Sequence, residues 1–343
     1  MAPDLSDETE LELPEAKLEK LVAPQAGPRK YELIYSITLS LIYVHLGAGY
    51  SIYLAWTRAF WSTIFFTYIL YVLAQIGVCA GAHRLWSHRS FKATLPLQIL
   101  LMVMHSLSYQ YTATNWARDH RLHHRYADTD ADPHNSTRGF FYCHMGWLIV
   151  KKHPEVKRRG KFIDMSDIYS NPVLRFQKKY AIPFIGFVGF VLPTIIPVYF
   201  WGESLNVAYH FCILRYAANL HATFTINSFA HLWGYKPYDK SIQPTQNEIV
   251  SVVALGEGFH NYHHTFPWDY RAAELGNNAL NWTTLFIDLF AKIGWAYDLK
   301  TVPKDIVYKR ADRTGDGTDL WGRKIDYYLW FTIRHIFYIL CHF

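Results

Sequence analysis

Several motifs that would assign a familiar chemistry are missing from this chain of 343 residues. There is no His-Glu-x-x-His motif of the zinc proteases and no G-x-G-x-x-G turn that would bind a dinucleotide. The four cysteines are scattered and form no Cys-x-x-Cys pair, so neither a zinc ribbon nor a disulfide framework is indicated, and we interpret them as reduced thiols. No nucleic-acid-binding motif occurs and the net charge is only +6, so we expect no nucleic-acid partner.

Long apolar runs are abundant, since 51% of the residues are hydrophobic and 17% are aromatic. A membrane-crossing helix needs about 20 mostly apolar residues, and four segments approach that length. Only a few residues separate the first segment from the second and the third from the fourth. We therefore predict an all-α integral membrane protein with four transmembrane helices in two hairpins. The predicted segments are residues 33–55, 60–82, 181–201 and 205–226.

The distribution of Lys and Arg orients these helices in the membrane. The two short links carry only Arg58, whereas residues 83–180 are rich in Lys and Arg, as cytosolic segments are. We therefore expect both termini, residues 83–180 and residues 227–322 to face the cytosol, with the latter two forming a helical cap. Asn135 and Asn281 stand in Asn-x-Ser/Thr sequences, but on this topology neither should carry a sugar.

The chain divides into three parts. Residues 1–30 are acidic and polar, unlike a secretory signal, and are expected to form a disordered cytosolic arm. Residues 31–322 form the main domain, in which the short apolar stretch 95–110 is expected to be a buried or interfacial helix. Residues 323–343 form an apolar tail that is too short to span comfortably, which favours a helix in the membrane interface. The sequence Asp312–Arg323 begins like a calcium loop but ends on Arg where a Glu is needed, so we expect no calcium there.

Histidines are concentrated in three clusters outside the apolar segments, HRLWSH, HRLHH and HNYHH. The second and third have the spacing His-x-x-His-His, which places three imidazoles on one face of a helix. One more histidine follows the fourth apolar segment. Nine imidazoles are too many for one tetrahedral zinc and suit two ions of higher coordination number, with Fe, Cu, Ni and Zn all open. The predicted metal ligands are His83, His88, His120, His123, His124, His231, His260, His263 and His264.

Carboxylates near these clusters allow two interpretations. The acidic run Asp128, Asp130 and Asp132 either orients the histidines of the second cluster or forms a solvated turn. A ferritin-like di-iron bundle would need two Glu-x-x-His pairs, and only Glu257–His260 has that spacing, so such a bundle is disfavoured. His134 lies outside the predicted ligand set, and the isolated histidines elsewhere are interpreted as structural or surface residues.

Six stretches of the chain resemble one family, the membrane acyl-CoA desaturases, which include the animal Δ9-type stearoyl-CoA desaturases and their insect relatives. The resemblance covers residues 31–317 in the right order and spacing. Its motifs read GAHRLWSHR, WARDHRLHHRYADTDADPHN, RGFFYCHMGW, NSFAHLWGYKPYD, GEGFHNYHHTFPWDY and RTGDGT. The sequence TGDGTDLWG is closer to the insect members, whose specificity has diversified towards Δ11 and other positions.

The resemblance implies O2-dependent desaturation of a long-chain fatty acyl-CoA, with the new double bond at Δ9 or an insect-type position such as Δ11. It implies two iron ions held by the nine histidines, with Asn227 holding an iron through water. It further implies electrons from cytochrome b5 and its NAD(P)H-dependent reductase, and a location in the endoplasmic reticulum membrane. Two alternatives stay open: a related histidine-cluster lipid hydroxylase, and a non-catalytic metal-binding membrane protein.

The resemblance also implies contacts with the acyl-CoA headgroup region, at Arg118, Asp119, Lys151 and Lys152. Tyr111 and Phe224 stand where family members place an Asn and a Trp against the substrate, so regioselectivity and chain length do not carry over. Tyr71 lies twelve residues, just over three helical turns, before His83. As a hypothesis it caps the methyl end of the acyl chain, and the alternative is a lipid-facing or packing tyrosine.

Overall fold

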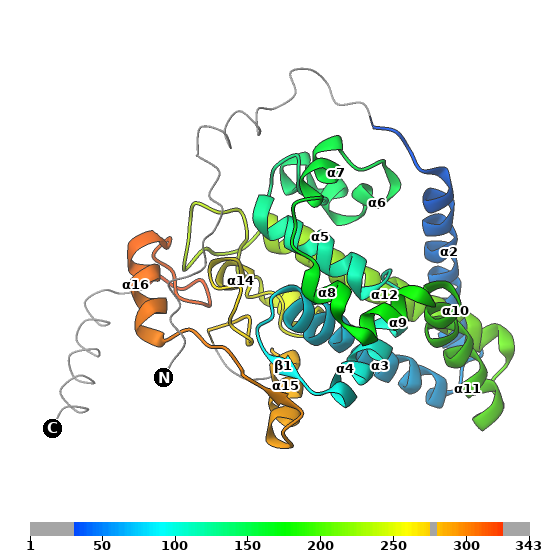
Figure 1. The fold of residues 1–343 in the computed structure, drawn as a ribbon. Helices are drawn as coiled ribbons and strands as arrows, with labels where there is room; N and C mark the ends of the chain where they lie inside the picture. Colours follow the sequence, from blue (N-terminus) through cyan, green and yellow to red (C-terminus); the bar gives the residue numbers. More distant parts are fainter. Residues whose placement is uncertain (1–30, 275–279, 325–343) are drawn as a thin grey trace.

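The computed structural model describes residues 31–274 and 280–324 (Figure 1). The predicted arm 1–30 lies outside these residues, as does the predicted tail 323–343 except for its first two residues. The described chain is mainly helical, which confirms the predicted class. Its one sheet is an antiparallel pair of very short strands, β1 (Lys92–Ala93) and β2 (Ala296–Tyr297).

Among the described residues, three helices are long and apolar enough to cross a membrane. They correspond to the first three predicted segments, although the second continues five residues further than expected. The first long helix is α2 (Tyr35–Thr57). The second is α3 (Trp61–Ile76), which continues as the π-helical η1 (Gly77–Ser87). The third consists of α10 (Ala181–Gly186), the π-helical η4 (Phe187–Val191) and α11 (Leu192–Trp201).

The fourth predicted segment lies in α12 (Leu205–Leu232), a helix of 28 residues that runs six residues beyond the predicted end. It is not among the three helices that are apolar enough to cross a membrane. α12 packs against α2, α3 and α11, and Arg215 and Asn219 are buried there. The Arg215 guanidinium donates to the carbonyls of Leu107 and Gly189, each at 2.5 Å. Carbonyls of neighbouring helices thus accept from both terminal nitrogens of Arg215, which lets α12 carry a buried arginine within its apolar sequence.

Shorter helices pack beside the long ones (Figure 1). The predicted stretch 95–110 forms α4, whose Leu97 and Leu101 are buried against the second long helix. The shorter elements are α4 (Leu95–Ser108), α5 (Ala113–Tyr126), η2 (Ser136–Arg138), η3 (Tyr142–Gly146), α6 (Trp147–Ile149), α7 (Pro154–Gly160), α8 (Ser166–Ser170), α9 (Pro172–Lys179), α13 (Glu248–Val253), α14 (His260–Thr265), α15 (Trp282–Lys292) and α16 (Lys304–Thr314).

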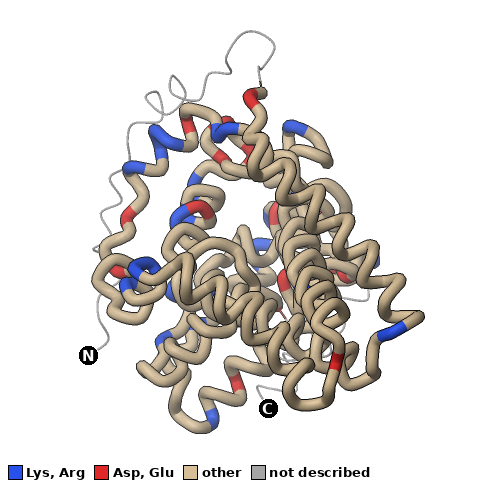
Figure 2. Tube along the Cα trace, turned by 90° about the vertical axis from the view of Figure 1, so that its right-hand side faces the viewer, with Lys and Arg blue, Asp and Glu red and all other residues tan. Residues whose placement is uncertain are grey.

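Charged residues are sparse on the long helices and concentrated on the shorter segments (Figure 2). Trp56 and Trp61 lie on either side of the link that carries Arg58, and they are 88% and 84% exposed. Aromatic residues gather in this way where a membrane meets water. The distribution agrees with long helices that face lipid.

The asparagines of the two Asn-x-Ser/Thr sequences are inaccessible in the fold. Asn135 and Asn281 are both buried, and the side chain of Asn281 donates to the carbonyl of Arg271 at 2.9 Å. The same side chain caps α15 by accepting from the N–H of Thr284. Neither asparagine can carry a sugar in the folded protein, and burial supplies a reason that is independent of topology.

Candidate metal centre

His83 and His88 lie at the π-helical end of the second long helix. In an α-helix, residues five apart point about 140° away from each other, towards different faces. Here the backbone N–H of His88 donates to the carbonyl of His83 at 3.1 Å, the five-residue step of a π-helix. The two rings therefore meet, with centroids 4.9 Å apart. The sequence could have indicated the π-helical turn, because two histidines five residues apart lie on the same face only in a π-helix.

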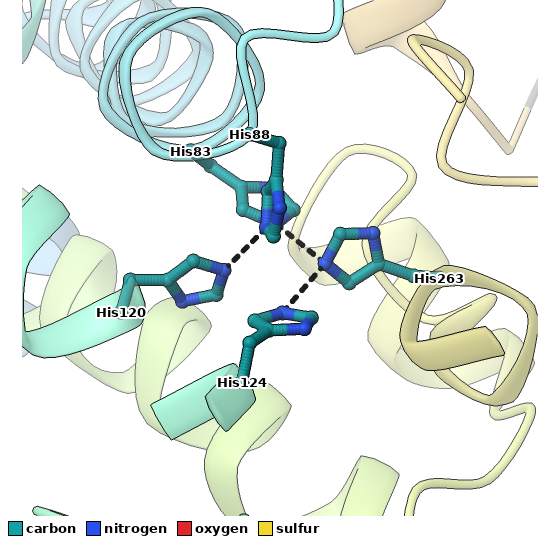
Figure 3. A group of neighbouring side chains, drawn as sticks. All are labelled: His83, His88, His120, His124 and His263. Atoms are coloured by element: carbon teal, nitrogen blue, oxygen red, sulfur yellow. Dashed lines mark hydrogen bonds between the residues drawn. The ribbon is translucent and has the colours of Figure 1, made fainter. Parts of the chain in front are cut away.

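Five imidazoles converge in Figure 3, and we call them the five-histidine group. His83 and His88 come from the second long helix, His120 and His124 from one face of α5, and His263 from α14. The Nε2 atom of His263 lies 2.9 Å from that of His83 and 3.0 Å from that of His124. The Nε2 atoms of His88 and His120 are 2.8 Å apart.

The remaining four predicted ligands form a second, four-histidine group. His123 comes from α5, His231 from the last turn of α12, and His260 and His264 from α14. The Nε2 atom of His260 lies 3.1 Å from that of His231 and 3.1 Å from that of His264. Consecutive residues of α5 and of α14 enter different groups, so the groups are neighbours, and the rings of His124 and His264 stack at 4.1 Å.

The spacing and charge of these imidazoles suit metal ions. Nitrogens on adjacent corners of an octahedron, with metal–nitrogen bonds of about 2.1 Å, lie about 3 Å apart. The Nε2 atoms of the directly contacting pairs lie 2.8 to 3.3 Å apart, and the possible ligand atoms of each group all lie within 4.8 Å of one another. For six of the nine imidazoles, burial lowers the pKa far below its ordinary value, and neighbouring imidazoles add to this effect, so these six rings are neutral and offer lone pairs. The shift holds for His88, His120, His124, His260, His263 and His264.

Three carboxylates lie near the outer nitrogens of predicted ligand histidines, and Asp128 and Asp132 of the acidic run are among them. The same two aspartates also accept hydrogen bonds from backbone N–H groups of the turn, so the run has both of the expected features. Burial alone would raise the pKa of Asp132, but His123 and His134 outweigh it, so this carboxyl is anionic. Asp130 instead pairs with Arg138 at 3.1 Å. Such carboxylates fix the tautomer and orientation of a ligand imidazole. The contacts are His83 Nδ1 to Glu257 at 2.9 Å, His123 Nδ1 to Asp132 at 2.8 Å and His231 Nδ1 to Asp128 at 3.4 Å.

Replacing Asp132 by asparagine should weaken metal binding at the four-histidine group. Removal of an outer partner of this kind typically costs about 10–100-fold in metal affinity. We expect the metal content of purified protein, measured by inductively coupled plasma mass spectrometry, to fall towards half of the wild-type value. The matched control is Asp130→Asn, because Asp130 pairs with Arg138 at 3.1 Å. Equal metal loss in both variants would contradict the role of Asp132.

A buried arginine holds Glu257 in place. Arg84 is 1% exposed, and its Nε and Nη2 donate to one oxygen of Glu257 at 3.0 and 2.9 Å. Its Nη1 donates to the Tyr270 carbonyl and to Thr284 Oγ1. Burial would raise the pKa of Glu257, but Arg84 and His83 lower it to about 2. The sequence analysis did not predict the Arg84–Glu257 pair. Its only indication in the sequence was that an arginine directly follows a predicted ligand, His83.

A cavity of about 920 Å³ begins beside the five-histidine group. Asp119, His120 and Asn227 line its polar end, and Asn227 lies one turn before His231 on α12. Tyr111 and Phe224, which the resemblance assigned to substrate, also line it. The rest of the wall is largely apolar and aromatic, so the cavity suits an extended apolar ligand.

Three of the four predicted headgroup residues meet at Asp119, which lines the polar end of this cavity. Arg118 Nε donates to Asp119 at 2.9 Å, and Lys152 forms an ion pair with the other oxygen of Asp119. Lys151 pairs instead with Glu32 at 2.5 Å. Asp119 thus holds two cations beside the cavity, and Lys151 belongs to a separate pair.

Tyr71 is not brought to this cavity. Its hydroxyl donates to the carbonyl of Val253 at 2.6 Å, and its ring stacks on Tyr68. His134 is the opposite case, because it lies outside the predicted ligand set but lines the cavity, with Nδ1 3.4 Å from Asp132.

Taken together, the buried histidine groups, the apolar cavity and the membrane-length helices define a membrane protein with a candidate two-metal centre. Comparison with known proteins names the family. A fatty acid desaturase family model matches residues 59–283, and the chain belongs to that family.

Curated relatives match almost the whole chain. An acyl-CoA Delta(11) desaturase of Spodoptera littoralis is 62% identical, covering 94% of this chain and 95% of the relative. A (11Z)-hexadec-11-enoyl-CoA conjugase of Bombyx mori is 58% identical, covering 92% and 96%. An acyl-CoA Delta-9 desaturase of Acheta domesticus is 50% identical, covering 92% and 87%.

Proposed function

We propose that this protein is an acyl-CoA desaturase that uses O2 to introduce a C=C bond into a long-chain fatty acyl-CoA. The observation that carries the proposal is the position of the apolar cavity, which begins beside the five-histidine group. The 62% identical relative is named for Δ11, so we propose Δ11 as the first position to test, with Δ9 as the alternative.

The nine histidines would hold two iron ions, one in each group, and Asn227 would contribute through water. Bound iron supplies, with O2, the oxidising power to remove hydrogen from an unactivated methylene, which side chains cannot do. The protein's part is to keep the donor nitrogens aimed inward. Glu257, Asp132 and Asp128 do this by holding the Nδ1 side of their imidazoles.

The cavity would bind the acyl tail by burial, at about 0.8 kcal/mol per methylene. Tyr111 and Phe224 form part of its wall and exclude water from the chain. The headgroup would remain at the polar end, where Arg118 and Lys152 flank Asp119 and can meet the CoA phosphates. Lys151, paired with Glu32, would join them if that exposed pair opens.

We further propose that α12 is the fourth transmembrane helix and completes two hairpins. The histidine groups and the shorter helices would then form a cytosolic cap, with both termini on the cytosolic side of the endoplasmic reticulum membrane. Electrons would reach the centre from cytochrome b5 and its NAD(P)H-dependent reductase. A buried α12 surrounded by three apolar helices supports this arrangement.

Expression in a desaturase-deficient host tests the proposed function. Gas chromatography with mass spectrometry of the host's fatty acids should reveal a new monounsaturated acid whose double bond lies at Δ11 or Δ9. Hydroxylated acids instead of unsaturated ones would replace the proposal with lipid hydroxylation. An unchanged profile from an iron-loaded protein would refute both activities.

A further inference from the structure

A second cleft, with a volume of about 350 Å³, reaches the five-histidine group from a different side than the apolar cavity. Among the described residues, the two share no lining residue. On α5, His120 lines the apolar cavity, whereas Arg121 and Arg125, one helical turn apart, line the second cleft. An acyl chain in the apolar cavity would therefore leave the second cleft open. Its lining residues are Ser87, His88, Arg89, Arg121, Arg125, Ile163 and Asp164.

His88 connects this cleft to the five-histidine group. It is partly exposed, whereas His83 and His263 of the same group are buried. Its Nε2 atom points towards the other rings and lies 2.8 Å from that of His120 (Figure 3). A single imidazole thus separates the second cleft from the metal-binding atoms of the group.

The short helix α7 borders the cleft, because it lies beside α5 (Figure 1). The guanidinium carbons of Arg125 on α5 and Arg159 on α7 lie 5.8 and 5.3 Å from the centre of the same Tyr126 ring. Ile163, which lines the cleft, packs against the apolar cluster that contains Val156 of α7. The cations that α7 presents to solvent therefore lie close to the cleft.

Three cations of this region, which we call the cationic surface, are Arg125, Lys157 and Lys161, and all three are exposed. The carboxylates of the same region pair with other arginines, so they do not neutralise the cationic surface. These pairs are Glu155 with Arg158, Asp164 with Arg89, and Asp167 with Arg89 and Arg121. An excess of positive charge attracts and orients an acidic partner, and salt weakens the attraction.

We infer that the cationic surface docks an electron-donor protein with an acidic face, and that its electrons enter the five-histidine group through His88. This inference rests on the proposed desaturation. In that reaction two C–H bonds of the acyl chain break and a C=C bond forms, while O2 is reduced to two water molecules. The chain supplies two of the four electrons that O2 takes up, so a donor must supply the other two, and solvent supplies two protons. A donor at the second cleft can do so while the acyl chain occupies the apolar cavity.

Charge reversal tests the docking surface. Membranes containing the wild type or Lys157→Glu/Lys161→Glu receive saturated acyl-CoA and increasing amounts of reduced cytochrome b5, and unsaturated product is measured by mass spectrometry. The cytochrome concentration that gives half the maximal rate should rise about 10-fold in the variant at low ionic strength. The difference should largely disappear in 1 M salt, where charges are screened beyond about 3 Å. The half-maximal concentration of acyl-CoA should stay at the wild-type value.

A small reductant separates docking from chemistry. Each protein is reduced with dithionite in the absence of O2 and then given O2 for a single turnover. Because dithionite needs no docking surface, Lys157→Glu/Lys161→Glu should form as much product as the wild type. The matched control is Lys304→Glu/Lys309→Glu on α16, which lies away from α7 in Figure 1 and carries both lysines exposed. This control should keep the wild-type dependence on cytochrome.

Chemical cross-linking gives a measurement that does not depend on turnover. A carbodiimide joins a lysine to a carboxylate in direct contact, and peptide mass spectrometry should find the cytochrome linked to Lys157 or Lys161. Cross-links confined to other lysines, or an unchanged cytochrome dependence of Lys157→Glu/Lys161→Glu, would overturn the docking surface. A rise in the half-maximal acyl-CoA concentration alone would also overturn it and would assign these lysines to the CoA phosphates. Absence of product from the wild type in the single turnover would instead overturn the proposed function.

Discussion

Replacing His263 by alanine is expected to abolish product formation and to deplete bound iron. His263 Nε2 lies within 3.0 Å of the Nε2 atoms of both His83 and His124, so its loss opens the five-histidine group on two sides. Removing an outer partner of a ligand costs about 10–100-fold, and loss of a direct ligand should cost more. We expect more than a 100-fold fall in desaturated product, measured by mass spectrometry, together with reduced iron in the purified protein.

The matched control for this variant is His210→Ala. His210 lies on α12 outside both histidine groups, and its Nδ1 bonds to the carbonyl of Asn206 within the same helix. This variant should retain iron and activity. Wild-type turnover by His263→Ala would remove His263 from the proposed ligand set. A similar fall in iron for both variants would mean that histidine loss acts through folding.

The second large effect is expected for Glu257→Gln. Glu257 is 3% exposed and is the carboxylate partner of both Arg84 and His83, so the change leaves a buried guanidinium without its anion. Breaking a buried pair in this way typically destabilises a protein by about 3–5 kcal/mol. We expect a marked fall in melting temperature in detergent and, because His83 loses its orienting carboxylate, about 10–100-fold weaker iron binding.

A double variant separates these two effects. In Arg84→Gln/Glu257→Gln neither charge of this pair remains, so part of the lost stability should return. Iron binding should remain weak, because no carboxylate faces His83 Nδ1. Recovery of both properties in the double variant would show that Glu257 serves only to neutralise Arg84. Full stability of the single variant would contradict the ion pair itself.

The sequence predicted the histidine set because the spacing of neighbouring histidines decides whether their imidazoles lie on the same side of a helix. His-x-x-His-His places three imidazoles on one helical face whatever the rest of the chain does, and the structure places all nine predicted histidines in two groups. The apolar segments could also be predicted from local sequence, because a helix that faces lipid must itself consist mostly of hydrophobic residues. That reasoning succeeded for three segments and was less informative for α12, where carbonyls of neighbouring helices accept from the terminal nitrogens of the buried Arg215.

The sequence by itself therefore determined the helical class, the apolar segments and the candidate ligands, because each depends on residues within a few turns of one another. Only the tertiary structure decided which carboxylates face the imidazoles, that Arg84 contacts Glu257, and that the Tyr71 hydroxyl donates to the carbonyl of Val253. Glu257 lies 173 residues from Arg84, and Val253 lies 182 residues from Tyr71. Contacts over such separations depend on how the helices pack, and no local periodicity encodes them.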